Sequence, residues 1–426
     1  MKIPRKVCTE EELKCFGKDP MGFVLKLHEE FSDIVEVEMG STLYVFPFKP
    51  EYIKQIIEEK HVGRTSFSNL FEPIAGGSLI LSEGDEWREK RMMLAPFFYK
   101  PLVTGKRVEE LAEMAIEEWN SSYLERKIVD GRQMITFYCI SVLSEVIFGY
   151  AISKEKMKEI YTNWNTALEC FTKTMGENAD DSDIERMGDA CQRIEDIFYK
   201  LIREWNNGGI GYNNNGILSH MLKNSVNEEI IVKNIKGLFM AGFETISGAL
   251  SWLFADLAEN PEWQKKIENQ VLQEDFKVDT DEGTIKQCYD ETVRLHPPLV
   301  FIDRAMKTEI QVGEYYLPKD SEVLICPYVV HRDERYWQKA LAFRPERVEI
   351  KKYIEDKSYK YFPYGGGMMK CMGEKMSVLE RNALLKAVLS KYQFEIAEGC
   401  SIEEDNALVL RPKLLMLQLK KDDDNE

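Results

Sequence analysis

The stretch YFPYGGGMMKCMGEK at residues 361–375 is the most informative pattern in this chain of 426 residues. Three consecutive glycines lead to Cys371, and Gly373 follows two positions later. Glycines allow a backbone to approach a flat ligand closely, because no side chain stands in the way. The apolar residues from Val378 onward predict a helix, so Cys371 should lie just before a helix N-terminus. We therefore expect a loop that presents a cysteine to a ligand.

A cysteine at a helix N-terminus is favoured as a thiolate, because backbone N–H groups and the helix dipole stabilise negative charge. A thiolate in an apolar pocket lined by glycines has the properties of an axial ligand of haem iron. The alternative for Cys371 is a buried free thiol beside a tight turn, since free cysteines are commonly buried. The glycines on both sides favour the ligand.

A second pattern places an acid and a hydroxyl side by side in the apolar stretch LFMAGFETISGALSW at 238–252. Glu244 and Thr245 follow Gly242, and burial of a carboxylate is costly unless it has a partner. The Thr245 hydroxyl can donate to the carbonyl of Ala241 four residues back and open the helix locally. A groove with an acid, a hydroxyl and water suits proton delivery. The alternative is a helix with one polar stripe that faces solvent.

Two weaker patterns involve arginines. Glu291 and Arg294 lie three residues apart in ETVRLHPP, on a helix that the prolines end. Arg347 lies in the proline-containing segment FRPER, and one carboxylate between two guanidiniums would form a structural clamp. Trp87 and Arg91, four residues apart, would present an indole N–H and a guanidinium to ligand carboxylates. The alternative for Glu291 and Arg294 is an ordinary surface ion pair. The alternative for Trp87 and Arg91 is an arginine whose aliphatic stem covers a half-buried tryptophan.

The composition excludes several classes of protein. The formal net charge of −17 argues against a nucleic-acid-binding protein, which needs basic patches against phosphate. The nine cysteines contain no Cys-x-x-Cys pair and the five histidines no i, i+4 pair, so no zinc site is visible. Mostly free thiols fit a reducing compartment. The N-terminus has no signal-peptide core and we find no apolar span of about 20 residues, so we expect a cytoplasmic protein. A membrane anchor outside this sequence stays open.

Hydrophobic periodicity predicts individual elements. Apolar residues at helical spacing indicate a helix over 20–31, and alternation around a Gly-Ser turn indicates a hairpin over 34–47. A long, largely apolar helix is predicted over 229–259, and a strand-like alternation closes the chain at 407–419.

Together these elements predict a single domain over 1–426 that is mainly α with a small β-sheet lobe. The β-rich part should come from about 34–60 and 300–325 with the C-terminal strands. The helical body should span about 86–296 and 373–390.

In this order and spacing, the four patterns resemble the cytochrome P-450 family of haem-thiolate monooxygenases, from about Asp19 to Lys420. The resemblance implies the fold of that family, with haem b buried between two long helices. It also rests on the segments Asp19-Pro20, Phe148-Gly149, Ala241-Gly242-x-Glu244-Thr245, His331-Arg332-Asp333 and Phe343-x-Pro345-Glu346-Arg347.

The resemblance implies a role for each candidate residue. Cys371 corresponds to the axial ligand of the iron, and Glu244 and Thr245 to the acid–alcohol pair that delivers protons. Haem propionates would be bound by Trp87, Arg91 and Arg304, and the structural triad would be Glu291, Arg294 and Arg347. The remaining expected haem contacts are Ala241, Gly242, Tyr364, Gly365, Gly367 and Gly373.

Two positions depart from the family pattern. Met369 stands where members usually carry an arginine or histidine that binds a propionate, which puts the strength of haem binding in question. Tyr364 replaces the usual phenylalanine, and a hydroxyl near the sulfur would move the reduction potential.

The implied activity is that of an oxidoreductase, a monooxygenase that inserts one oxygen atom from O₂ into a small lipophilic substrate. A sterol or fatty acid is favoured, which implies a place in lipid or sterol metabolism. Leu299, Val300 and Phe301 are expected to line the substrate pocket. We see no flavin or iron–sulfur segment, so electrons should come from a separate reductase or ferredoxin, and we expect a monomer.

Two other functions compete with this prediction. An oxygen-independent haem-thiolate isomerase or dehydratase is disfavoured, because such members usually lack the acid–alcohol pair that Glu244 and Thr245 supply. The other alternative is a non-catalytic haem-binding or sensor protein. Met369 would fit it, because such a protein has less need of the usual propionate-binding residue.

Overall fold

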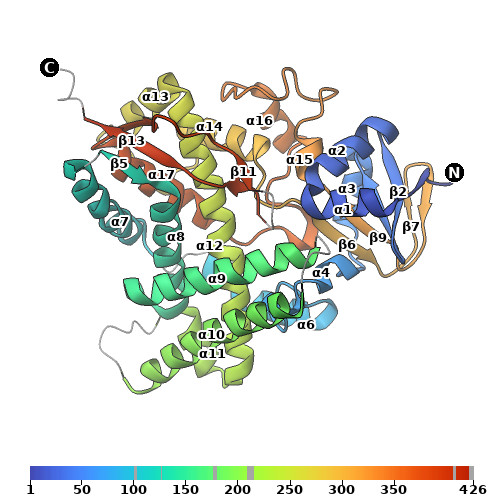
Figure 1. Cartoon of the computed structure of the whole chain (residues 1–426), viewed down its shortest axis with the longest axis horizontal. Helices are drawn as coiled ribbons and strands as arrows, with labels where there is room; N and C mark the ends of the chain where they lie inside the picture. The colour runs from blue at the N-terminus through green and yellow to red at the C-terminus, as the bar shows by residue number, and fades with distance from the viewer. Residues whose placement is uncertain (100–102, 126, 176–179, 209–214, 406–408, 422–426) are drawn as a thin grey trace.

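Long helices make up most of the molecule, and a β-sheet lobe lies at one end (Figure 1). The structure is a computed structural model that describes residues 1–99, 103–125, 127–175, 180–208, 215–405 and 409–421. The predicted mainly α class with a small β lobe is confirmed. The helices are α1 (Glu10–Lys18), α2 (Pro20–Phe31), α3 (Pro50–Glu58), α4 (Ser66–Asn69), α5 (Glu72–Ala75), α6 (Gly84–Tyr99), α7 (Gly105–Glu125), α8 (Gly131–Phe148), α9 (Lys154–Met175), α10 (Asp181–Asn206), α11 (Ile217–Lys223), α12 (Glu228–Glu259), α13 (Pro261–Val271), α14 (Gly283–Leu295), α15 (Pro327–Val330), α16 (Val348–Glu355) and α17 (Glu374–Leu389).

The β lobe is built around a six-stranded sheet with the order β1-β2-β3-β9-β6-β4. The predicted hairpin is present, since β2 and β3 pair antiparallel from Ile34 opposite Pro47 to Met39 opposite Thr42. Side-chain caps fix where helices of this lobe begin. The Asp19 side chain, for example, accepts a hydrogen bond from the N–H of Gly22 at the start of α2. The strands are β1 (Arg5–Val7), β2 (Ile34–Met39), β3 (Thr42–Pro47), β4 (Val62–Gly63), β6 (Ile302–Met306) and β9 (Glu322–Ile325), with a separate hairpin of β7 (Ile310–Val312) and β8 (Tyr315–Leu317).

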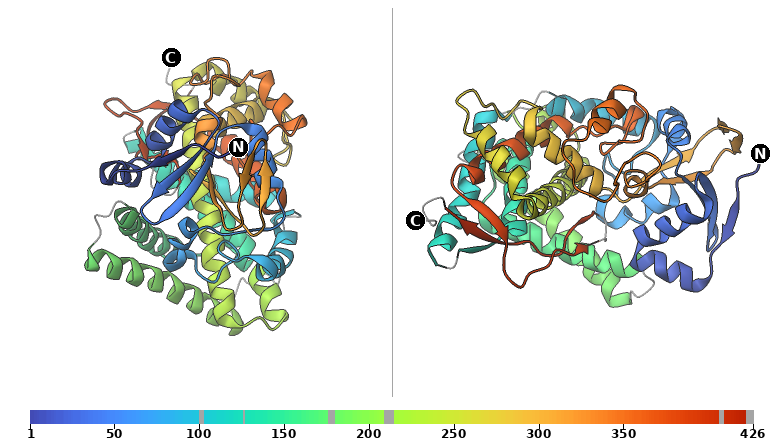
Figure 2. Two further views of the ribbon diagram at one scale, coloured as in Figure 1. Left: turned by 90° about the vertical axis from the view of Figure 1, so that its right-hand side faces the viewer. Right: turned by 90° about the horizontal axis from the view of Figure 1, so that it is seen from above.

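The C-terminal strands do not join this lobe, which corrects the predicted arrangement. They form a second sheet with the order β10-β13-β5, on the opposite side of the helical body from the N-terminal strands (Figures 1 and 2). The strand predicted over 407–419 is divided, because Pro412 cannot donate to a sheet ladder and the chain changes partner there. Residues 406–408 of that prediction lie outside the described residues. The strands are β5 (Ile128–Asp130), β10 (Gln393–Ile396), β11 (Glu404–Asp405), β12 (Arg411–Pro412) and β13 (Met416–Lys420).

Helix α12 forms the axis of the core. Its bounds, Glu228–Glu259, agree with the predicted helix over 229–259. By length and composition it could cross a membrane, contrary to the expectation that no such span exists, but 78% of its most apolar window is buried inside the molecule. The core helix of a soluble protein passes the same test, so this helix is weak evidence for a membrane span.

Candidate functional site

Glycine geometry shapes the loop that carries Cys371. Gly365 and Gly367 have φ angles of +67° and +62°, in the left-handed region that other residues rarely adopt. Gly366 lies so close to its surroundings that a Cβ atom would stand 2.4 Å from a tyrosine hydroxyl. The N–H of Cys371 donates to the carbonyl of Tyr364 at 3.0 Å and closes the loop. Each of the three glycines is therefore required by the local backbone or by space.

The Cys371 thiol is accessible to solvent although protein atoms surround it closely, as expected for a group in a recess. The N–H of Gly373 donates to its Sγ at 3.3 Å, just before α17 begins. Burial raises the pKa of the Cys371 thiol, while the Gly373 N–H and the charge of Arg91 act in the opposite direction. The Gly373 N–H thus acts in the predicted direction, but in the protein alone desolvation of the thiolate is the larger effect. A metal ion deprotonates a coordinating thiol outright, so ligation itself would supply the missing stabilisation.

Arg91 of α6 is tied to the cysteine loop. Its guanidinium donates to the carbonyl of Lys370 at 2.6 Å and to the Tyr99 hydroxyl at 3.1 Å. It also lies 5.9 Å from the centroid of the Trp87 ring, so the predicted pair shares one helix face. Met369 is partly buried and packs against apolar residues of two core clusters. The apolar side chain at this position therefore has a packing role.

Arg304 of β6 is a buried cation without a carboxylate partner among the described residues. Its Nη1 donates to the backbone carbonyl of Asp303 at 2.7 Å, and its Nε has no hydrogen bond. The Asp303 carboxylate instead accepts hydrogen bonds from Thr65 and Ser68. Burial lowers the pKa of Arg304 to about 10. A buried guanidinium with an unused donor is a suitable partner for a ligand carboxylate.

The middle of α12 carries the next group of predicted site residues. Ala241 is exposed and Gly242 and Thr245 are half-buried, in a helix that is otherwise buried nearly throughout. The Thr245 hydroxyl donates to the carbonyl of Ala241 at 2.7 Å, as the residue types allow. An accessible stretch in the centre of a core helix indicates that a ligand can reach it there.

Glu244 does not lie on a solvent-facing stripe. Its side chain is buried, its Oε2 accepts the indole N–H of Trp164 at 3.0 Å, and its Oε1 forms an ion pair with Arg411. Both carboxylate oxygens are therefore engaged by the protein. The alternative of a polar stripe in water is wrong for this residue.

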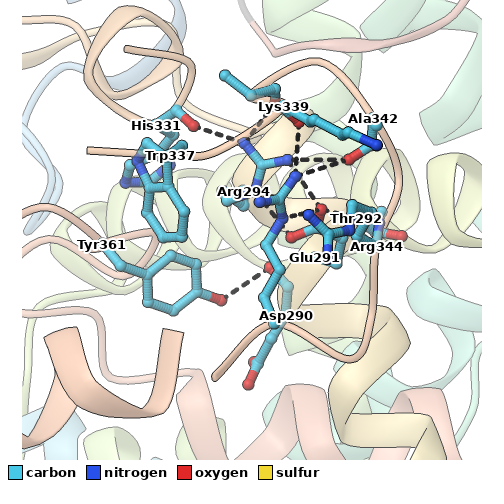
Figure 3. Close-up of polar contacts among 12 residues, drawn as sticks. Asp290, Glu291, Thr292, Arg294, His331, Trp337, Lys339, Ala342, Arg344 and Tyr361 are labelled. Atoms are coloured by element: carbon cyan, nitrogen blue, oxygen red, sulfur yellow. Dashed lines mark hydrogen bonds and ion pairs between the residues drawn. The ribbon is translucent and has the colours of Figure 1, made fainter. Parts of the chain in front are cut away.

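The three residues of the suggested clamp meet in the core, as Figure 3 shows for Glu291 and Arg294. Arg294 donates to the two carboxylate oxygens of Glu291 at 2.7 and 2.8 Å, and Arg347 donates to Oε1 at 2.8 Å. The backbone N–H of Arg344 adds a further bond to the same oxygen at 3.0 Å. The Arg294 guanidinium lies 5.0 Å from the centroid of the Trp337 ring. These contacts are buried, so the alternative of a surface ion pair is wrong.

The clamp is connected to the cysteine loop. Arg294 donates to the carbonyl of His331 at 2.7 Å, and Nε2 of His331 accepts the N–H of Phe362 at 3.0 Å. Burial lowers the pKa of His331 to about 3, so its imidazole is neutral and can accept that bond. The hydroxyl of Tyr361 donates to the carbonyl of Asp290 at 3.1 Å (Figure 3). The segment that starts the loop is thus fixed to α14.

The expected lining residues lie in different environments. Leu299 is exposed, whereas Val300 is buried in the main core cluster. The Phe301 ring packs at 5.4 Å from Phe67 and 5.9 Å from Phe16, centroid to centroid. Of the three, Leu299 alone presents an exposed side chain.

The Tyr364 hydroxyl has partners of its own. It shares a hydrogen bond of 2.8 Å with Ser377 and donates to the Tyr289 hydroxyl at 3.4 Å. No hydrogen bond from this hydroxyl to the sulfur of Cys371 is present in the described part of the chain.

Several contacts of the site were not predicted. Trp164 and Arg411 hold Glu244, and His331 and Trp337 support the clamp. These residues are distant from their partners in sequence, and a single tryptophan or arginine carries no local signal. His331 stands in the His-Arg-Asp segment, which was noted without a role.

The arrangement fits a flat, anionic, iron-containing group. Cys371 supplies an accessible sulfur donor, the glycines give close backbone approach, and Arg304 retains an unused donor. Among the described residues, no group of three or more His, Cys, Asp or Glu side chains could hold a metal ion by itself. A prosthetic group that holds iron through its own ring atoms would need from the protein only a ligand such as Cys371.

Sequence comparison shows the family to which this chain belongs. The family described as Cytochrome P450 matches residues 12–419. The chain belongs to the cytochrome P450 family. As a member, this P450 is an oxidoreductase of the monooxygenase type, with haem b as its cofactor. The family in general uses O₂, an organic substrate and electrons from a redox partner.

The curated relatives of this P450 are distant and diverse. Cytochrome P450 714B3 of Zea mays is 23% identical, over 91% of this chain and 77% of its own length. Cyclooctatin synthase of Streptomyces melanosporofaciens is also 23% identical, over 91% of this chain and 88% of its own. Cytokinin hydroxylase of Arabidopsis thaliana is 25% identical, over 79% of this chain and 70% of its own. These identities support the family and leave the substrate open.

Proposed function

We propose that this P450 binds haem b through Cys371 and oxidises a lipophilic substrate, with a sterol or fatty acid favoured. The observation that carries the proposal is an accessible thiol, on a glycine-shaped loop, in a chain that also exposes the centre of its core helix α12. Arg304, Arg91 and Trp87 are the proposed partners of the haem carboxylates. Arg304 has the strongest support, because no carboxylate among the described residues forms an ion pair with its buried guanidinium.

Haem iron with a thiolate ligand supplies the activation of O₂, since the thiolate favours O–O cleavage. The protein supplies binding and proton control. The Gly373 N–H donates to the sulfur and lowers its negative charge, which is one means by which a protein adjusts such a ligand. Because the Thr245 hydroxyl donates a hydrogen bond to the carbonyl of Ala241, its oxygen can accept a hydrogen bond from water. Glu244 is the acid of the proposed pair.

The clamp of Glu291, Arg294 and Arg347 has a supporting role in this proposal. Hydrogen bonds link it to the cysteine loop through His331, and the side chains of its three residues are completely buried. Its proposed task is to hold the loop rigid while the ligand sulfur keeps its orientation.

The proposed substrate class rests on the apolar character of the accessible residues. Ala241 in the middle of α12 and Leu299 in the segment after α14 have exposed apolar side chains. Electrons are proposed to come from a separate reductase or ferredoxin. A monomer in the cytoplasm is part of the same proposal, supported by nine cysteines that are all free thiols.

The proposal is tested by the spectrum of the reduced, CO-bound protein. Thiolate ligation should give a strongly red-shifted Soret band, and Cys371→Ala should abolish it. Cys400→Ala is the matched control, because this thiol is also free and partly exposed but lies outside the loop. The assignment is wrong if Cys371→Ala keeps the band and Cys400→Ala loses it. Spectral shifts on addition of a sterol, a fatty acid or an amine would then separate the substrate classes.

A further inference from the structure

Three elements meet at the carboxylate of Glu244, although the sequence pattern contains only one of them. Glu244 belongs to α12, Trp164 to α9 and Arg411 to β12. The indole N–H donates to Oε2 at 3.0 Å, and the guanidinium pairs with Oε1 through Nη1. The Glu244 side chain is only 3% exposed, so water does not compete freely for these oxygens.

The two partners of Glu244 differ in what they would lose if the contact opened. Trp164 is itself buried, and its indole has a single N–H. Loss of the acceptor for this N–H would cost about 1–3 kcal/mol of free energy. Arg411 has a second carboxylate at hand, because its Nε donates to Asp405 of β11 at 3.1 Å. Asp405 is 28% exposed, compared with 11% for Arg411. Accessibility therefore increases step by step from Glu244 to Asp405.

The charge of Arg411 is well supported at this position. Burial acts to lower the pKa of Arg411, but the carboxylates of Glu244 and Asp405 raise it overall. An arginine stays protonated near neutral pH in any case, so Arg411 would remain charged and paired with Asp405 if Glu244 moved away from it.

We propose that Trp164 and Arg411 are positioning residues for Glu244, with Trp164 as the fixed contact and Arg411 as the exchangeable one. The inference rests on the proposed role of Glu244 in proton delivery. In the structure each carboxylate oxygen accepts one bond from the protein and the side chain is 3% exposed, so water gains free access to the carboxylate when one contact opens. The Arg411 contact opens with less loss, because Asp405 keeps the guanidinium paired. The network thus holds Glu244 beside Thr245 and lets it turn about the Trp164 contact.

The first test measures the contact itself by equilibrium unfolding of the purified haem-loaded protein. Glu244→Gln, Arg411→Gln and the double variant form a thermodynamic cycle. Non-additivity of about 10-fold or more in the unfolding equilibrium constant is expected for a buried pair. Lys413→Gln is the matched control, because Lys413 lies close to Arg411 and pairs at 3.0 Å with Glu403, but both side chains are exposed. That change should alter the constant at most about 5-fold. Additive effects of the first pair would overturn the contact.

The second test measures proton delivery without an identified substrate. Hydrogen peroxide serves as oxidant and guaiacol as the chromogenic probe, and the initial rate is recorded for each haem-loaded variant. Arg411→Gln should lower the rate about 10-fold, in the range found for supporting residues around metal sites. Arg411→Lys should restore most of the rate. Trp164→Phe, which keeps an aromatic side chain but removes the N–H, should also lower the rate.

The decisive comparison uses the Glu244→Gln background. If Arg411 acts through Glu244, Arg411→Gln should change the rate less than about 2-fold in that background. An equal loss in both backgrounds would overturn the positioning role, and so would an unchanged rate in the Arg411→Gln single variant. The CO-bound spectrum distinguishes a failure of the proposed function from a failure of this inference. A wild-type protein without the thiolate band refutes the proposed function, whereas a normal band with additive variants refutes this inference alone.

Discussion

Replacement of Arg347 by alanine should destabilise the protein by about 3 kcal/mol, far more than the same change at neighbouring Arg344. Arg347 donates to Oε1 of Glu291 at 2.8 Å and to the carbonyls of Gln338 and Lys339 at 2.5 and 2.7 Å. The Glu291 carboxylate is completely buried, so loss of a cation next to it is not compensated by water.

The magnitude follows from what remains after the substitution. Breaking a buried ion pair usually costs about 3–5 kcal/mol. Glu291 would keep both bonds from Arg294 and the backbone N–H of Arg344, which argues for the lower end of that range. The carbonyls of Gln338 and Lys339 belong to exposed residues and can bond to water instead. Arg294→Ala should be more damaging, because it removes two bonds to the carboxylate at once.

Arg344→Ala is the matched control for this prediction. The Arg344 guanidinium pairs with Glu346 at 3.1 Å, its one ion-pair partner among the described residues, and the two side chains are 33% and 53% exposed. The bond from its backbone N–H to Glu291 survives the change. A partly exposed pair of this kind contributes about 0–1 kcal/mol.

Urea unfolding followed by far-UV circular dichroism would measure both variants against the parent protein. The free energy of unfolding is obtained by linear extrapolation, and similar slopes show that the unfolded states are comparable. Arg347→Lys keeps the charge and should recover part of the loss. If Arg347→Ala and Arg344→Ala differ by less than about 0.5 kcal/mol, the buried clamp does not stabilise the fold in the way argued.

Two further predictions use buried groups outside the clamp. Burial raises the pKa of Glu380 to about 8 and its Oε2 lacks a hydrogen bond, so the folded protein holds a proton that the unfolded chain releases above its ordinary pKa of 4.5. The free energy of unfolding should therefore fall as the pH rises from about 4.5 to about 8. The gain in unfolding free energy from Glu380→Gln should grow by about 1 kcal/mol per pH unit between roughly pH 6 and 8, and a gain independent of pH would contradict the assignment. Arg304→Gln should weaken haem binding about 10-fold or more, since a charge-assisted bond contributes about 1.5–3 kcal/mol. Transfer of haem to a competing acceptor protein measures this, and unchanged retention would remove Arg304 from the proposed haem contacts.

Local patterns were sufficient to predict α12, the β2–β3 hairpin and α17, because each is encoded by periodicity or turn chemistry within its own residues. The glycines of the 361–375 loop were predictable for the same reason. Their left-handed φ angles and close packing are properties that few other residues allow.

The tertiary structure alone decided how these pieces are connected. β5 has three residues and pairs with β13, whose partner residues lie almost 300 positions away, so no local signal marks it. The partners of Glu244 lie 80 and 167 residues away, in a helix and a strand with no special composition. The upward shift in the Cys371 pKa also depends on the surrounding protein, because desolvation is set by every atom packed around the thiol. Residue types specify which bonds a group can form, whereas burial and distant neighbours decide which of those bonds exist.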